Sequence, residues 1–276
     1  MKQHQASAQR MGLAQIVEGV NTLPLQGKTI IFQAMIKCSS SQNIRAAILE
    51  WTGGIDSPTS DVVNNWTSGT YTAGNFFLAS NLAITAVSDA VKPDAATWTQ
   101  ISVSGIVTLA KNLIVMIWTE GTAAQNVTLD ITEAGVYVAT AVQNWCPRPI
   151  QQELALCQRY YEKSYDLDVP PGTTGDDHGV PYSFCPVTIN AYTGYYLFLG
   201  ANNFKITKRI VPYAILLSMN TGATSSLDLT GGTRAGSSAP NPSQTTLGYI
   251  FIDNTGAATQ APPGQVQFHW IAFCEL

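Results

Sequence analysis

Short strand-like segments separated by turn residues run along almost the whole chain, and they constrain its fold more than any other feature. Each segment is either apolar throughout or alternates apolar and polar residues, which is the pattern of a buried or half-buried strand. Strands are therefore predicted at Thr29–Lys37, Arg45–Trp51, Thr97–Val107, Asn112–Trp118, Val127–Ile131, Gly135–Ala139, Tyr182–Ile189, Gly194–Leu199, Phe204–Lys208, Tyr213–Ser218, Gly248–Asp253 and Gln265–Phe273. Residues 221–246, rich in Gly, Ser, Thr and Pro, are expected to form a long loop.

One segment near the middle of the chain, QQELALCQRYYEKSY, has a helical pattern instead. Ile150, Leu154, Cys157 and Tyr161 recur at the spacing of one helix face. A helix of about three turns is not stable alone in water, so its apolar face must dock on another surface. We therefore expect these four residues to lie at the junction of two β-domains, with Pro149 or Ile150 opening the helix.

These patterns predict an all-β chain of two β-sandwich, jelly-roll-like domains joined by one short α-helix. The first domain is expected at residues 20–147, the linker helix at residues 148–165, and the C-terminal β-sandwich at residues 166–276. Residues 1–19 are interpreted either as an attachment segment or as the first strand.

The composition narrows the classes of partner. The chain is 45% hydrophobic but only 12% charged, with a net charge of −4 and no basic run, which argues against nucleic acid. The longest apolar stretches, such as Asn112–Trp118, are too short to span a bilayer, and the N-terminal residues lack the apolar core of a signal peptide. The five cysteines have no zinc-site spacing and are expected to be buried free thiols.

The helical segment ELALCQRYYEKSY resembles a signature of tail-fibre-like and other virion appendage proteins of tailed bacteriophages and prophages. The terminal HWIAFCEL and the segment FKITKRIVP are similar to other parts of that family, as are AILEWTGGIDSPTSDVVNNWTSGTYTAGNFF and NLIVMIWTEGTAAQNVTLDI, so the resemblance extends from about Gly12 to Leu276. Phe273 and Cys274 stand where the family usually has a small residue and an aspartate.

The resemblance implies a jelly-roll domain similar to carbohydrate-binding modules, then a helix and a second small β-domain. It also implies a protein of the virion, assembled in the host cytoplasm beside other virion proteins. Fibres are usually closed symmetric oligomers in which weak sites act together, so a homotrimer is expected.

The candidate glycan site lies in and beside a polar loop of the first domain. Trp51, Trp66 and Tyr71 could offer aromatic faces to sugar rings, while Asp56 and Asp61 could bond sugar hydroxyls. The alternative is that the three rings close the end of the sandwich core. Trp98 and Trp118, which lie inside strand patterns, are expected to be core residues.

No cofactor is indicated, and calcium is the only metal with candidate ligands in the first domain. Asp56, Asp61 and Asp130 offer the oxygen ligands that calcium takes, although no dense acidic loop surrounds them. By analogy, jelly-roll sugar-binding modules often carry a structural calcium.

A second polar cluster, Asp176, Asp177 and His178, lies in a glycine-flanked loop. It is either a metal or acid–base site or, as the simpler interpretation, a solvated turn. The sequence has no Gly-x-Ser-x-Gly elbow, and Gly231–Gly236 (GGTRAG) lacks the Lys-Ser/Thr of a phosphate loop.

Three functions remain. The first is a non-enzymatic tail-fibre or receptor-binding protein that contacts a host-surface glycan. The second is a purely structural capsid or tail decoration protein. The third is a polysaccharide depolymerase, which would need two carboxylates flanking a cleft.

Overall fold

The computed structural model describes residues 1–59, 61–180, 182–185, 197–224, 228–229, 246–254 and 264–274. It is an all-β structure with short helices, as the sequence predicts. The chain divides between Cys146 and Pro147 into two compact units. In the described part of the chain, no helix is long and apolar enough to cross a membrane.

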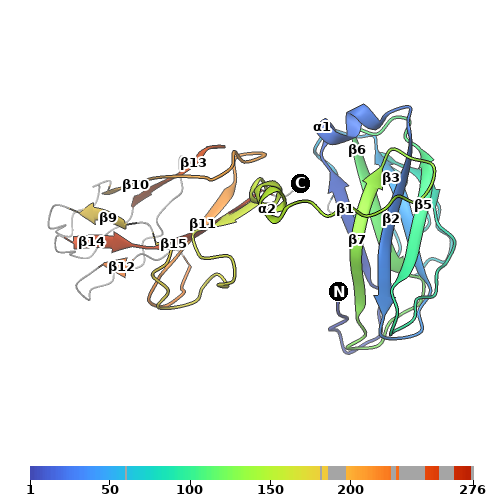
Figure 1. Ribbon diagram of the computed structural model, residues 1–276, viewed down its shortest axis with the longest axis horizontal. Coiled ribbons are helices and arrows are strands. Elements are labelled where there is room, and N and C mark those ends of the chain that lie inside the picture. Colours follow the sequence, from blue (N-terminus) through green and yellow to red (C-terminus); the bar gives the residue numbers. More distant parts are fainter. Residues whose placement is uncertain are drawn as a thin grey trace. The chain divides into compact units, whose positions relative to one another are not determined.

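The N-terminal unit is a sandwich of two antiparallel sheets, with a short helix α1 (Gly19–Thr22) and a 3-10 turn after the first strand (Figure 1). One sheet has the order β1-β6-β3-β4, formed by Gly12–Val17, Asn112–Thr119, Ile44–Trp51 and Leu82–Val87. The other has the order β5-β2-β7, formed by Thr99–Ile106, Thr29–Cys38 and Leu129–Tyr137.

Apart from β3 and β4, strands that follow each other in sequence lie in different sheets of this sandwich. The chain therefore crosses repeatedly between the layers, and the sandwich expected from the sequence is confirmed. Residues 12–17 form its first strand, which fits the first-strand interpretation of the N-terminal segment, and an attachment role of residues 1–19 stays a prediction. The more specific prediction that this sandwich is a jelly roll stays a prediction.

The strands β3 and β6 are buried on both faces, which explains why their sequences are mostly apolar. Leu113, Val115 and Ile117 of β6 point into the core between the two sheets. Their alternate neighbours Ile114, Met116 and Trp118 belong to a second apolar cluster. The second cluster lies on the opposite face of the β1-β6-β3-β4 sheet, because successive side chains of a strand point to opposite faces.

The loop between β3 and β4 covers this outer face. It supplies Val62, Val63, Phe76 and Phe77, all buried, to the second cluster. The ring of Phe76 stacks on that of Trp118 at a centroid distance of 5.2 Å. A polar-looking loop thus acts as a third layer over the sandwich.

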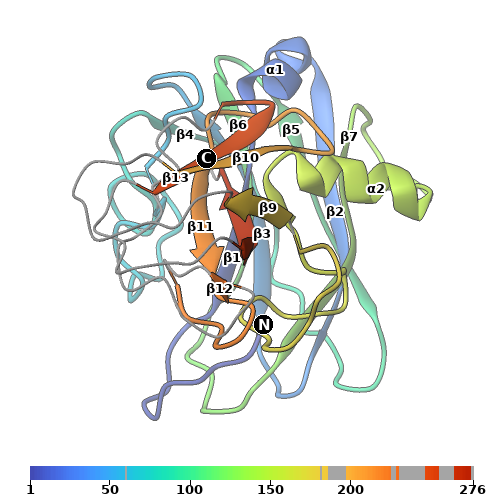
Figure 2. The same ribbon diagram turned by 90° about the vertical axis from the view of Figure 1, so that its left-hand side faces the viewer.

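The described strands of the C-terminal unit form three small antiparallel sheets; Figure 2 shows α2, β9, β11 and β12 from another direction. The first sheet has the order β11-β15-β8, formed by Tyr213–Leu217, His269–Phe273 and Tyr161–Lys163. The second has the order β12-β14-β9, formed by Asp228–Leu229, Gly264–Gln267 and Tyr182–Cys185. The third pairs β10 (Leu197–Asn203) with β13 (Tyr249–Asn254).

The predicted helix exists but is shorter than expected. Helix α2 covers Ile150–Gln158, directly after Pro149, whereas Tyr161 opens the strand β8 instead of extending the helix. The backbone of this segment pairs with the last described strand, since Phe273 lies opposite Tyr161. Tyrosines favour strands, and this long-range pairing overrides the helical spacing.

The helix face predicted to lie at the domain junction is largely exposed, because the rest of the C-terminal unit does not cover it. Ile150 is 77% exposed, Tyr161 is 42% exposed, and Cys157 is also exposed, while Leu154 is half-buried. Packing within the C-terminal unit therefore leaves this face available. Its docking on the first domain stays a prediction.

Other expectations need correction. Phe204–Lys208 is not a strand, and β4, β8 and β12 were not predicted. Trp98 is 43% exposed, with the Lys37 ammonium 5.0 Å from its ring centroid, whereas Trp118 is fully buried as expected. The predicted strand residues 186–189 and 194–196, and residues 225–227 and 230–245 of the predicted loop 221–246, lie outside the described residues.

The expected burial of the cysteines is only half right. Cys38 and Cys274 are buried free thiols, but Cys146 and Cys157 are exposed. Cys146 is the last residue before the boundary between the units, and Cys157 lies in α2 of the C-terminal unit. The side chain of Cys185 lies outside the described part.

A buried ion pair replaces the predicted strand at residues 204–208. Lys208 is 1% exposed and Glu162 is 3% exposed, and the ammonium of Lys208 lies 2.5 Å from the Glu162 carboxylate. Lys208 also donates to the Gln158 carbonyl at the end of α2, and the Lys205 backbone N–H donates to Glu162. This pair therefore holds the end of α2, strand β8 and the 204–208 segment together.

In the N-terminal unit, the carboxylate of Glu50 organises the turn before β6. Glu50 is 2% exposed and accepts hydrogen bonds from the Thr85 hydroxyl and from the backbone N–H groups of Thr108 and Leu109. Burial raises the pKa of this carboxyl, but these hydrogen bonds together outweigh burial and hold the pKa below its ordinary value.

We expect Glu50→Gln to destabilise the N-terminal unit by about 1–3 kcal/mol at neutral pH, because the amide leaves buried donors unpaired. Folding lowers the pKa of Glu50, so its contribution to stability is full above the ordinary carboxyl pKa and is lost as pH falls from there through the lowered pKa of the folded protein. Urea denaturation from pH 7 to pH 3 should thus show the gap between the two proteins shrinking. The exposed Glu133→Gln is the control, and a gap independent of pH would contradict this account.

We expect Lys208→Met to cost the C-terminal unit about 3–5 kcal/mol, because it leaves the Glu162 carboxylate buried without its cation. Lys205→Met is a matched control, since the Lys205 side chain is exposed and only its backbone contacts Glu162. Thermal unfolding of both variants measures the difference. Equal melting temperatures for the two variants would show that the buried pair does not stabilise this unit.

Candidate functional site

Trp66, half-buried in the loop between β3 and β4, stands between two grooves of the N-terminal unit. The Asp61 groove, of about 290 Å³, is lined by Gly12, Ala14, Ile16, Thr59, Asp61, Val62, Trp66 and Met116. The Arg10 groove, of about 560 Å³, is lined by Ala8, Gln9, Arg10, Trp66, Thr67, Glu120, Gly121 and Thr122. Ligand pockets are usually about 300–1,000 Å³, so both are near or within that size.

The position of Trp66 depends on a glycine and a phenylalanine. Its ring packs edge-on against Phe76, with a centroid distance of 5.7 Å and an interplanar angle of 82°. Its six-membered ring also approaches the backbone of β1 so closely that a Cβ on Gly12 would lie 2.6 Å from Cη2. Only glycine leaves room for this approach, and the indole is held between the loop and the edge strand.

Three chain segments meet at the Arg10 groove because of strand pairing. Strand β1 pairs with β6, with Gly12 opposite Trp118, and the pairing resumes at Gln9 and Ala123. The residues before β1 are therefore placed beside those after β6. The loop that carries Trp66 completes the groove.

Arg10 is fixed in this groove by one hydrogen bond and one ring. Its Nη1 donates to the Ser68 carbonyl at 2.7 Å, and its guanidinium lies 6.0 Å from the centroid of Phe76. Within the described parts of the chain, no carboxylate pairs with Arg10. Most of its five N–H donors thus have no protein acceptor among these residues.

Glu120, in contrast, is paired. It forms an ion pair with Arg45 and accepts a hydrogen bond of 2.9 Å from Asn43, and the guanidinium of Arg45 lies 5.0 Å from the Tyr71 centroid. Burial raises the pKa of Glu120. The opposing effect is larger, because Arg45, Asn43 and Tyr71 donate hydrogen bonds to the carboxylate and Arg45 adds its positive charge, so the net shift of the pKa is downward. Glu120 therefore stays ionised at neutral pH.

The five residues of the predicted glycan site have different roles. Trp66 and Asp61 both line a groove. Trp51 is 4% exposed and donates from Nε1 to the Gly54 carbonyl at 2.9 Å, so its ring faces are closed to a ligand. Tyr71 is half-buried, with its ring centroid 5.2 Å from that of Phe76. A packing role is therefore favoured over a glycan-binding role for Trp51 and Tyr71. Both belong to the second apolar cluster, on the outer face of the sheet, and not to the end of the sandwich core as the alternative expected.

Asp56 serves the fold instead of a ligand. Its Oδ1 accepts hydrogen bonds of 2.8 Å from the Gly19 N–H and of 2.7 Å from the Asn112 side chain. Its own N–H donates to Asn112 Oδ1 at 2.8 Å. These bonds tie the loop to the start of α1 and of β6.

The three calcium candidates are not brought together. Asp56 bonds to α1 and β6, Asp61 is exposed in the loop, and Asp130 is exposed on β7 of the other sheet. Across the described ranges, carboxylate, imidazole and thiol groups that could jointly hold a metal gather only at Asp176, Asp177 and His178.

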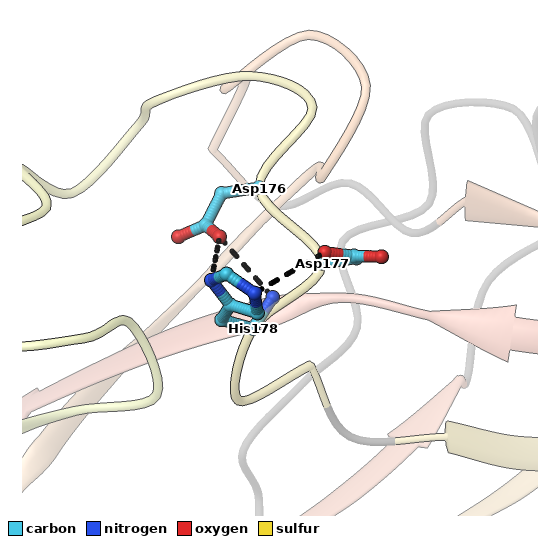
Figure 3. A group of neighbouring side chains, drawn as sticks. All are labelled: Asp176, Asp177 and His178. Atoms are coloured by element: carbon cyan, nitrogen blue, oxygen red, sulfur yellow. Dashed lines mark hydrogen bonds and ion pairs between the residues drawn. The ribbon is translucent and has the colours of Figure 1, made fainter.

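Figure 3 shows this cluster on its loop. The ligand atoms of Asp176, Asp177 and His178 lie within 4.8 Å of one another. His178 Nδ1 is 3.4 Å from Asp176 and 3.6 Å from Asp166, and the imidazole is 73% exposed. These contacts suit an acid–histidine turn whose imidazole is exposed and whose Asp176 side chain is only 11% exposed.

A hydrogen-bonded serine–histidine pair lies close by but is closed to substrate. The hydroxyl of Ser164 is 2.9 Å from His269 Nδ1, and His269 Nε2 is 2.9 Å from the Asp176 carbonyl. His269 is fully buried, with Tyr165 stacked on its ring at 3.6 Å. Both ring nitrogens are engaged, so this pair is structural.

Sequence reasoning missed Arg10, Arg45 and Glu120. The one signal in the sequence was the scarcity of charge. The chain has only 14 Lys and Arg in 276 residues, so few cations can lie beside an aromatic loop. Their convergence depends on the pairing of β1 with β6, which the sequence left undetermined.

Comparisons with known proteins give no assignment: no family model matches the chain, and no curated protein matches its sequence.

We expect Gly12→Ala to displace the Trp66 indole, because the new Cβ would lie 2.6 Å from it. The displacement should change near-ultraviolet circular dichroism and cost about 1–3 kcal/mol of stability. Gly69→Ala is the control, since a Cβ there meets nothing within 4 Å. If the two variants gave the same spectrum and melting temperature, the close approach of Trp66 to β1 would be refuted.

Proposed function

We propose that this protein is a non-enzymatic virion appendage protein that binds a host-surface glycan through Trp66 and its two grooves. The observation that carries the proposal is a half-buried tryptophan between two hollows of ligand size, on an all-β protein of low charge. The resemblance of the ELALCQRYY segment to phage appendage proteins supports the virion assignment.

The groups around Trp66 suit a polyhydroxyl ligand. An aromatic ring can stack on the apolar face of a sugar, while a few polar groups orient the hydroxyls. Asp61, Gln9, Thr67 and Thr122 supply carboxylate, amide and hydroxyl groups beside the ring. Together these groups provide an apolar platform with a polar rim.

A binding role is favoured over hydrolysis. A glycosidase needs one carboxyl that can donate a proton and a second carboxylate across the scissile bond. Glu120 is tied to Arg45 and its pKa is lowered, which opposes a role as proton donor. Asp61 lines the Asp61 groove and Glu120 lines the Arg10 groove, so the two carboxylates do not line one common groove.

The wider biology of the proposal rests on the resemblance. We propose a homotrimer held in the virion by other virion proteins, because symmetry lets several weak glycan sites act together.

A structural decoration protein is the second candidate, and one surface favours it. An apolar groove of about 370 Å³ opens between β1 and β7, which are edge strands of the two sheets. Leu13 lines it and is 51% exposed. An attachment to another virion protein could cover this groove.

The test is binding of the full chain to an array of bacterial surface polysaccharides. Trp66→Ala should weaken binding at least about tenfold, because it removes the stacking ring. Trp98→Ala is a matched control, since Trp98 directly precedes β5 of the other sheet, is 43% exposed and lines neither Trp66 groove. Equal binding by both variants, or no binding by the parent chain, would reject the glycan site and favour the decoration role.

A further inference from the structure

We infer that the Arg10 groove binds the acidic unit of an anionic saccharide, with the charged group of that unit held by the Arg10 guanidinium. This inference rests on the proposed glycan-binding function and names the class of glycan. It depends on the unpaired guanidinium, the balance of charge across Trp66, and the size of the groove.

The guanidinium of Arg10 is positioned but incompletely used. One nitrogen donates to the Ser68 carbonyl and the group lies against Phe76, so the side chain is held without a carboxylate partner in the described structure. A guanidinium presents a planar fork of donors that matches a carboxylate or phosphate with two parallel hydrogen bonds. An acidic sugar would supply the missing acceptor.

The charges around the groove favour an anion. Arg10 and Glu120 line the groove, and the charge of Glu120 is balanced by its ion pair with Arg45. The three side chains together carry one net positive charge, on a chain whose net charge is −4. The carboxylate of Glu120 is already bonded to Arg45 and Asn43, so it leaves Arg10 free for the ligand.

The two grooves differ in sign, which orients the ligand. Asp61, exposed and with its Oδ1 accepting from the Val63 N–H, gives the Asp61 groove a negative charge. An acidic unit would be repelled there and attracted to the Arg10 groove. The expected ligand has an acidic sugar in the Arg10 groove and an uncharged sugar in the Asp61 groove.

The experiment measures binding of the full chain to three immobilised probes: polygalacturonate, a glycerol-phosphate-substituted glycan and uncharged dextran. The carboxylate and phosphate probes share the anionic chemistry and separate its two sources. We expect binding to at least one anionic probe, at least about tenfold tighter than to dextran, and weakening as salt is raised.

Substitutions then assign the effect to Arg10. Arg10→Gln should weaken binding to the anionic probe about tenfold or more, and Arg10→Lys should restore only part of it, because it keeps the charge without the fork. Lys92→Gln removes one exposed positive charge outside both grooves and should leave binding unchanged. Melting temperatures of the variants establish that each remains folded.

Three results would overturn the inference in different ways. Binding to dextran that depends on Trp66 but not on Arg10 would leave the glycan-binding function standing and reject the anionic ligand. An absence of binding to all three probes, together with an absence of binding to the polysaccharide array, would reject both. Equal losses with Arg10→Gln and Lys92→Gln would show a general charge effect instead of a site.

Discussion

The burial of one sheet on both of its faces is the constraint on which the N-terminal unit depends. Strands β3 and β6 present apolar side chains on both faces, so a two-layer sandwich would leave one of these faces in water. The loop between β3 and β4 removes this cost by placing Phe76 and Phe77 over Trp118. Because the loop is held down by packing, the tryptophan at its margin, Trp66, keeps a defined position beside β1.

The chain has few charged residues, and the buried ionic groups described above each hold particular segments of the fold together. Glu50 satisfies the backbone donors of the turn before β6, and the pair of Glu162 with Lys208 joins α2 to the sheets of the C-terminal unit. A buried charge is tolerated only where partners replace its water. Arg10 differs from these groups: it is oriented by Ser68 and Phe76 but has no acidic partner in the described residues, which is the arrangement expected of a group that awaits a ligand.

The strand pattern predicted the class of fold and the interior strands well, because their apolar residues are fixed by burial. It failed where long-range pairing decides the outcome. Tyr161 continues a helical spacing but lies in β8, which pairs with β15. The segment Phe204–Lys208 alternates like a strand but instead contributes Lys208 to the buried ion pair with Glu162. The candidate site shows the same limit. Trp51 and Trp66 look alike in sequence, each followed by threonine in a polar loop, yet only the fold closes one and leaves the other between two grooves.

The register of β1 against β6 is the remaining step between this fold and its candidate site. Continued beyond Gly12 to the Gln9–Ala123 bridge, the pairing brings Arg10 alongside Glu120, which is more than a hundred residues away in the sequence. A slip of one residue would turn the side chains of β1 to the opposite faces and remove Gly12 from beneath the Trp66 indole. The register that places Gly12 beside the ring thus also assembles the groove, so the shape of the site and its charge depend on the same strand.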